Sequence, residues 1–153
     1  MSASETTATV RTYELEIAID APRDAVWRAL TEEANDWWLP DFRMVGEGSV
    51  VTFEASAGGQ LVERTKDGKS LLWWTVQMCT PLESLHLFGH IAPQWGGPNT
   101  TMLHLALEER AGGTLLRVQD ALFGHTTETG ARSLEDGWRL LFTDGLKRHV
   151  ERN

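Results

Sequence analysis

The segment that decides the fold is SLEDGWRLLFTDGL, residues 133–146, in which apolar side chains recur every three or four positions. This spacing places them on one face of a helix. The face consists of Leu134, Trp138, Leu141, Phe142 and Leu146. The pattern predicts one long helix from about Thr127 to Val150. Such a helix must bury its apolar face against another layer of secondary structure, which the rest of the chain has to supply.

The chain before this helix has the two-residue alternation of β-strands. From Met102 to Glu108, leucines occupy every second position, and Val10 to Ile19 alternates in the same way. Asp67-Gly68 and Gly112-Gly113 are typical of tight turns between antiparallel strands. These signals predict an antiparallel sheet of six to seven strands.

Two short helices are expected between the first strand and the rest of the sheet. Asp20 and Pro22 suit a helix start, and the pattern continues to about Leu30. A second short helix leads to Trp37-Trp38 and ends at Pro40. We therefore predict an α+β fold in which a curved antiparallel sheet wraps around the long C-terminal helix. Residues 1–9 are expected to be a disordered lead-in and residues 10–153 a single domain.

Composition excludes several classes of function. The net charge is −8, with 22 acidic and 14 basic residues, which disfavours binding to nucleic acid. Cys79 is the single cysteine, so neither an internal disulfide nor a paired-cysteine metal site is possible. The N-terminus does not have the pattern of a secretory signal, and no apolar run is long enough to span a bilayer. We expect a cytoplasmic protein.

Three stretches resemble a known superfamily: IDAPRDAVWRALT at residues 19–31, Trp37-Trp38, and GWRLL at residues 137–141 followed by Leu146-Lys147 and Glu151. Together they resemble the START-like helix-grip superfamily. More narrowly, they resemble the branch related to the activator of the ninety-kilodalton heat-shock protein ATPase. The resemblance implies the helix-grip fold over nearly the whole chain. It also implies roles that range from binding lipids, hormones or polyketides to assisting a chaperone or cyclising a substrate.

The sequence departs from this family at the end of the last strand. The family often has a histidine followed by Ser-Gly-Phe, whereas this chain has Asp120-Ala121-Leu122. By strand parity Asp120 points inward with Val118 and Leu122. Two interpretations stay open. Either the strand bulges or ends here and Asp120 caps the next turn, or Asp120 is a polar contact in a pocket, or an acid with a raised pKa.

The histidines do not predict a metal site. His86 and His90 are four apart on an expected strand, which separates them by about 13 Å. Both alternate with the apolar face, and so does His104. We expect surface histidines, with no metal and no cofactor.

The expected pocket lies between the long helix and the sheet. Its candidate ligand-binding residues are Phe53, Trp74, Val76, Met78, Asp120, Trp138 and Leu141. Trp73 alternates with Trp74 and is expected on the opposite face, where with Trp95 it would mark a contact surface.

Three functions remain as alternatives. The first is non-enzymatic binding of a small apolar ligand. The second is a protein-interaction module such as a chaperone ATPase co-activator. The third is a small cyclase or hydrolase that uses Asp120. The expected partner is a small hydrophobic molecule, or else a chaperone or other protein. The oligomeric state, monomer or homodimer, stays open.

Overall fold

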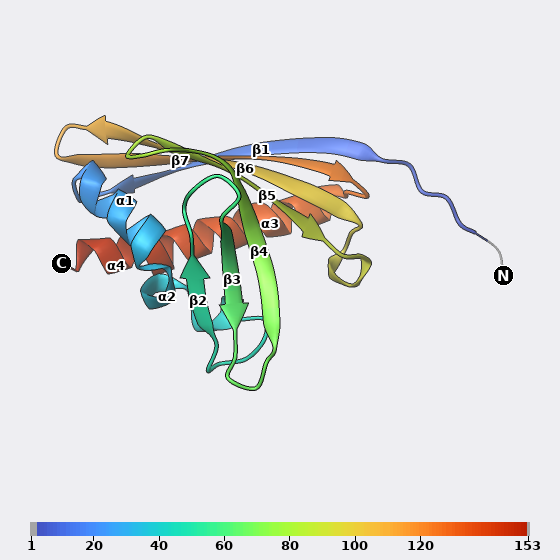
Figure 1. Ribbon diagram of the computed structural model, residues 1–153. Helices are drawn as coiled ribbons and strands as arrows, with labels where there is room; N and C mark the ends of the chain where they lie inside the picture. The colour runs from blue at the N-terminus through green and yellow to red at the C-terminus, as the bar shows by residue number, and fades with distance from the viewer. Residues whose placement is uncertain (1–2, 153) are drawn as a thin grey trace.

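The computed structural model describes residues 3–152. The segments with alternating apolar residues form the strands of one seven-stranded antiparallel sheet (Figure 1). The strands lie in the order β1-β7-β6-β5-β4-β3-β2. Their bounds are β1 Thr9–Ile19, β2 Val50–Phe53, β3 Gln60–Arg64, β4 Ser70–Thr80, β5 Ser84–Ile91, β6 Asn99–Arg110 and β7 Gly113–Gly124. The expected lead-in over 1–9 falls partly outside the described residues. Its described part has no regular structure before Thr9, and its disorder stays a prediction.

The helices confirm the predicted α+β arrangement. After β1 come α1 Arg23–Glu32, α2 Ala34–Trp37 and the short 3₁₀ turn η1 Pro40–Phe42; a second such turn, η2 Pro93–Trp95, precedes β6. The long C-terminal helix consists of α3 Glu128–Leu140, the π-helical segment η3 Leu141–Lys147 and α4 Arg148–Glu151. The sheet curves around this helix in Figure 1. The fold is a helix-grip.

The long helix begins where the sequence predicted it. Thr127 is the N-cap residue, and its hydroxyl accepts a hydrogen bond of 2.9 Å from the amide of Gly130. Most of the predicted apolar face is buried: Leu141, Phe142 and Leu146 have no measurable exposure, whereas Leu134 is only partly buried. The widening of the helix at η3 was not predicted, because it leaves no mark in the apolar spacing.

The π-helical segment packs directly on α2. A Cβ atom placed on Gly145 would lie only 2.5 Å from the carbonyl oxygen of Trp37. The indole of Trp37 is held in turn by a 2.8 Å hydrogen bond from its Nε1 to the Ala29 carbonyl oxygen. Glycine at position 145 therefore permits the close approach of the long helix to the short helices.

Two irregularities in β4 change which side chains face the helix. Leu61 pairs with Trp74 while Val62 pairs with Leu72, so Trp73 is an extra, unpaired residue. A second register shift occurs between Val76 and Met78. Strict alternation is broken twice, and both departures overturn predictions made from it.

The first correction concerns Trp73. It does not lie on the outer face but packs inward, with its ring centroid 5.2 Å from that of Trp38. The second concerns Met78, which was expected to share the inner face with Trp74 and Val76. Met78 pairs with His86 on the outer face, and 55% of its surface is exposed. In both cases the bulge reverses the side-chain direction that alternation would give.

Candidate functional site

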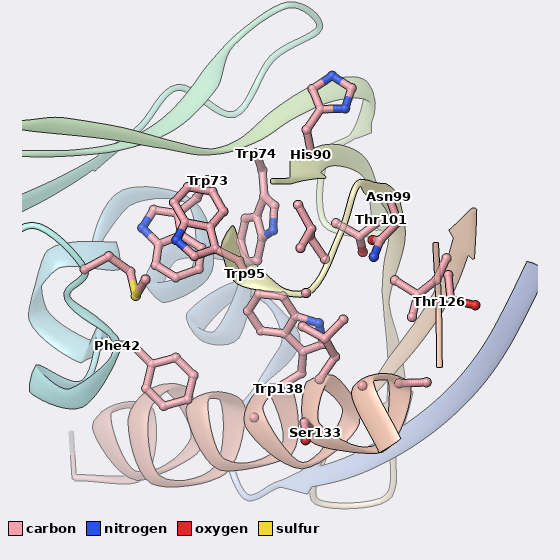
Figure 2. Close-up of a pocket in the computed structure, with 18 of the residues that line it drawn as sticks. Phe42, Trp73, Trp74, His90, Trp95, Asn99, Thr101, Thr126, Ser133 and Trp138 are labelled. Atoms are coloured by element: carbon pink, nitrogen blue, oxygen red, sulfur yellow. The ribbon is translucent and has the colours of Figure 1, made fainter. Parts of the chain in front are cut away.

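A pocket of about 520 Å³ lies between the sheet and the first half of the long helix. Strands β4, β5 and β6 form one wall, α3 forms the other, and the segments around η1 and η2 complete it. Figure 2 shows the indoles of Trp73, Trp74, Trp95 and Trp138 gathered around this space. The other large apolar residues in the lining are Phe42, Met44, Leu71, Leu72, Ile91, Leu122 and Leu134.

Trp38, Trp73, Trp74 and Trp138 form a connected cluster, because each of these rings contacts another. Trp138 lies 5.5 Å from Trp74 and 6.4 Å from Trp73, measured between ring centroids. Trp38 packs behind both strand tryptophans, at 5.2 and 5.6 Å, in edge-to-face geometry. These contacts fix the positions of the rings, so the pocket is bounded by packed aromatic side chains.

Of the seven candidate residues, the structure brings Trp74 and Trp138 into the pocket lining. Val76 and Leu141 lie in the closed core, and Phe53 packs against that core without lining this pocket. Met78 is on the outer face, as described above. Alternation identified Trp74 and Val76 as inward-facing residues of the sheet, but it does not show which inward residues lie in the closed core and which border the pocket.

Asp120 lies within β7, is 3% exposed, and points inward as strand parity predicted. The capping interpretation is therefore wrong. Its Oδ2 accepts a 2.6 Å hydrogen bond from the Tyr13 hydroxyl, and its Oδ1 accepts one of 2.6 Å from Thr101. Asp120 itself is not among the lining residues, whereas Thr101 is. The carboxyl group thus lies one side chain away from the pocket.

Burial dominates the electrostatics of this cluster. It raises the pKa of Asp120, and the hydrogen bonds from Thr101 and Tyr13 offset only part of the effect. Burial, followed by the charge of Asp120 and their shared hydrogen bond, raises the pKa of Tyr13 well above its usual range. The Trp138 N–H opposes that shift slightly. The same N–H is buried and makes no hydrogen bond of normal geometry.

A second buried carboxylate, Glu63, holds the segment that carries the pocket's Phe42 and Met44. It accepts hydrogen bonds from the amides of Met44 and Val45, from the Ser49 hydroxyl and from Trp73 Nε1, at 2.8–3.1 Å. Burial acts to raise the pKa of Glu63, but the hydrogen bonds outweigh it and the pKa is lowered. The sequence analysis did not identify this role, because the donors come from a loop whose path it could not predict.

Three histidines lie on strands β5 and β6. His86 and His104 stack on the outer face, with ring centroids 4.2 Å apart, and burial with the neighbouring charge of His104 lowers the pKa of His86. His90 is exposed but contributes to the pocket lining (Figure 2). Within residues 3–152, no group of three His, Cys, Asp or Glu side chains is placed to hold a metal ion. Nor does that part of the chain contain a helix long and apolar enough to cross a membrane.

The fold is shared with several solved structures. A protein from Rhizobium leguminosarum has 19% sequence identity and a TM-score of 0.70, with coverage of 96% of this chain and 98% of its own. Protein Mll3558 from Rhizobium loti has 21% identity and a TM-score of 0.71, with coverage of 91% and 96%. Ara h 8.0201 has 13% identity and a TM-score of 0.69, with coverage of 95% and 100%. At these identities the likeness concerns the fold alone.

The family is established by a different comparison. No curated protein matches the sequence. The family model described as Activator of Hsp90 ATPase homolog 1-like protein matches residues 20–151, which include α1, the pocket and the long helix. The chain therefore belongs to the Activator of Hsp90 ATPase homolog 1-like family and has the helix-grip fold.

Proposed function

We propose that this protein binds a small apolar molecule in the pocket between β4–β6 and α3. The observation that carries the proposal is the pocket itself: about 520 Å³ bordered by four tryptophans and further apolar side chains. Ligand sites typically have volumes of about 300–1,000 Å³ and a mostly apolar lining with few polar groups. The space persists although Trp74 and Trp138, which are bulky enough to fill it, are both present.

The arrangement of Asp120 favours binding over catalysis. A general acid or base must come within hydrogen-bonding reach of the group it protonates or deprotonates. Both oxygens of Asp120 are engaged by hydroxyls, and its side chain does not line the pocket. A cyclase or hydrolase that uses Asp120 would first have to displace Thr101 or Tyr13. We therefore place non-enzymatic binding ahead of that alternative.

A protein-interaction role is the second candidate, and one observation favours it. The outer face of the sheet exposes Met78, Phe88 and Met102, with Phe88 directly opposite Met102 on neighbouring strands. Exposed apolar side chains that cluster on one face are typical of contact surfaces. The family name also associates the fold with activation of a chaperone ATPase. Trp73 no longer supports this role, because it packs inward.

The test is a titration with the neutral fluorescent probe N-phenyl-1-naphthylamine. We expect one saturable site whose occupation increases probe emission and quenches tryptophan emission. Ala131 lines the pocket and neighbouring Arg132 is exposed on the same helix. Ala131→Phe should fill the space and weaken binding about tenfold or more, whereas Arg132→Phe should not. Equal affinity in both variants would place the probe elsewhere and leave the outer face as the functional surface.

A further inference from the structure

We infer that the free edge of β1 is a docking site for an extended basic segment of a partner protein, which adds to the sheet as a further strand. The inference is independent of the pocket, because it concerns the rim of the sheet. Three observations carry it: the backbone groups of β1 that face away from β7, the exposed side chains beside them, and the charge of this side of the molecule.

β1 is a long edge strand. The two edges of the sheet are β1, with 11 residues, and β2, with 4. An edge strand presents a row of backbone N–H and C=O groups with which another extended chain can pair. Figure 1 shows the segment before β1 leading away from the sheet, so that it does not fold back along this edge.

Two contacts with the long helix show which residues of β1 turn their backbone toward the free edge. The Ala18 carbonyl oxygen accepts a 2.6 Å hydrogen bond from Lys147 Nζ. The Asp20 amide, just after the strand, donates one of 2.8 Å to Glu151 Oε2. In an antiparallel strand, the N–H and C=O groups of one residue point to the same side, and those of the next residue point to the other. The even-numbered residues therefore face the free edge.

The odd-numbered residues face β7. A Cβ atom on Gly113 of β7 would lie 2.5 Å from the Ile19 carbonyl oxygen, which agrees with this assignment. Among residues 3–152, neither loops nor side chains form a hydrogen bond with the edge-facing backbone groups that precede Ala18 in the strand. At about 3.3 Å per residue, these groups offer about 20 Å of backbone to a partner. We call them the β1 edge; they belong to Val10, Thr12, Glu14 and Glu16.

The side chains of these four residues lie on the outer face of the sheet, and all four are exposed. Val10 is 65% exposed and pairs with Phe123, which is 53% exposed. Glu14 and Glu16 lie further along the strand. A strand that is added to the β1 edge places its own alternate side chains beside these. The site therefore combines an apolar end with an acidic end.

The acidic end has an excess of negative charge. The Arg117 guanidinium lies 3.3 Å from Glu14, 2.6 Å from Glu16 and 2.8 Å from Glu108. Arg110 contacts Glu108 as well. Three carboxylates thus share two guanidinium groups, and the chain as a whole has a net charge of −8. Lysine or arginine side chains opposite Glu14 and Glu16 offset this charge.

A second copy of the chain fits this edge less well. Its own β1 brings the same carboxylates and another net charge of −8. Like charges on paired strands are destabilising, and charged side chains on an edge disfavour pairing between identical strands. The occupant is therefore a basic segment. Its antiparallel pattern is Lys or Arg, any residue, Lys or Arg, any residue, Thr, any residue, and an apolar residue opposite Val10.

The experiment titrates the isotope-labelled full-length protein with the peptide acetyl-Lys-Thr-Lys-Thr-Thr-Thr-Val-amide, and with the same peptide carrying Glu in place of Lys. The amide signals of Thr12, Glu14 and Glu16 should shift saturably and exchange more slowly with solvent. We expect the lysine peptide to bind at least about tenfold more tightly than the glutamate peptide at low ionic strength, with a smaller difference in high salt. Absence of saturable binding, or equal binding of the two peptides, would overturn the inference.

Two variants test the edge itself. Thr12→Pro removes an amide that faces away from β7, which an edge strand tolerates, and should weaken binding of the lysine peptide at least about tenfold. Thr12→Val keeps that amide and should bind as the parent protein does. Unchanged affinity in Thr12→Pro would place the peptide elsewhere and refute the assignment.

Charge reversal tests the acidic end. The double variant Glu14→Lys with Glu16→Lys should prefer the glutamate peptide, and a retained preference for the lysine peptide would contradict the role of these carboxylates. Sedimentation velocity examines the other occupant. If the parent protein is a dimer that Thr12→Pro dissociates, a second copy occupies the β1 edge and the basic partner is wrong.

Discussion

Tyr13 and Asp120 are joined by a 2.6 Å hydrogen bond across two neighbouring strands, where their Cα atoms are also paired in register. Tyr13 is the single tyrosine of the chain. The pair links β1, at one edge of the sheet, to β7, where Asp120 departs from the histidine pattern that the resemblance implied. This bond lies beneath the long helix and beside the pocket. Titration of Tyr13 and Asp120 therefore tests whether the pair stays buried in the folded protein.

The first prediction concerns the ionisation of Tyr13. Tyrosine ordinarily titrates at about pH 10. Burial and the nearby Asp120 raise the pKa of Tyr13, so the folded protein should not form tyrosinate in that range. Absorbance at 295 nm should stay flat until the chain unfolds in alkali and then rise together with the loss of circular dichroism. Tyrosinate formation near pH 10 in folded protein would contradict the buried hydrogen bond.

The second prediction is a pH dependence of stability caused by Asp120. Its pKa is raised in the folded state, so between the ordinary value of about 3.9 and the folded value the native state binds more protons than the unfolded state. The contribution of Asp120 to the free energy of unfolding therefore falls as pH rises through that window. Asp120→Asn removes the titration and keeps the side-chain size.

Urea unfolding of both proteins from pH 4 to pH 8 tests this sign. The stability of Asp120→Asn relative to the parent protein should increase with pH. Subtracting one free energy of unfolding from the other cancels the contributions of all other titrating groups, because both proteins contain them. A flat difference would mean that Asp120 ionises as easily in the folded chain as in the unfolded one, and a difference that decreases with pH would mean that it ionises more easily in the folded chain.

The third prediction concerns Glu63, whose pKa is shifted in the opposite direction. A lowered folded pKa stabilises the protein above the unfolded value of about 4.3, and that stabilisation is lost as pH falls through the folded pKa. The Glu63 carboxylate accepts four hydrogen bonds. In Glu63→Gln, an amide NH₂ replaces one of its oxygens and faces N–H or O–H donors, with which it cannot pair as an acceptor. We expect a loss of about 2–3 kcal/mol at pH 7 that diminishes below pH 4.

Glu54→Gln is the matched control, because Glu54 is exposed on the neighbouring segment. It should change the free energy of unfolding by less than about 0.5 kcal/mol. Since Glu63 also receives the Trp73 indole N–H, its variant should alter tryptophan emission as well. Equal effects of the two substitutions would show that the Met44–Val45 loop is not held by this carboxylate.

The sequence predicted the sheet, the long helix and the inward position of Asp120, because these follow from periodicity within a single element. It could not predict Trp73 or Met78 correctly, because a bulge is set by the register between two strands, here β3–β4 and β4–β5. One extra residue in a strand turns the side chains that follow it to the opposite face of the sheet. A single sequence does not reveal which residues of neighbouring strands pair.

The pocket was only partly predictable for a related reason. Trp74 and Trp138 were identified because they lie on regular elements that face each other. Phe42 and Asn99 also contribute, but one is in the 3₁₀ turn η1 and the other is the first residue of β6 after a loop. The positions of such residues depend on tertiary contacts, such as the bond from Asn99 to His125.

The last prediction compares two glycines of the long helix that face different surroundings. A Cβ atom on Gly137 would meet only Phe42 Cε2, at the ordinary contact distance of 3.8 Å, whereas one on Gly145 would lie 2.5 Å from the Trp37 carbonyl oxygen. Alanine favours helix by about 1 kcal/mol over glycine. Gly137→Ala should therefore stabilise the protein by up to about 1 kcal/mol. Gly145→Ala should destabilise it by about 1–3 kcal/mol, because backbone atoms must move apart. Thermal and urea unfolding of the two variants measure both signs. If Gly145→Ala were also stabilising, the long helix would not contact Trp37 as closely as described, and the junction between α2 and η3 would have to be looser.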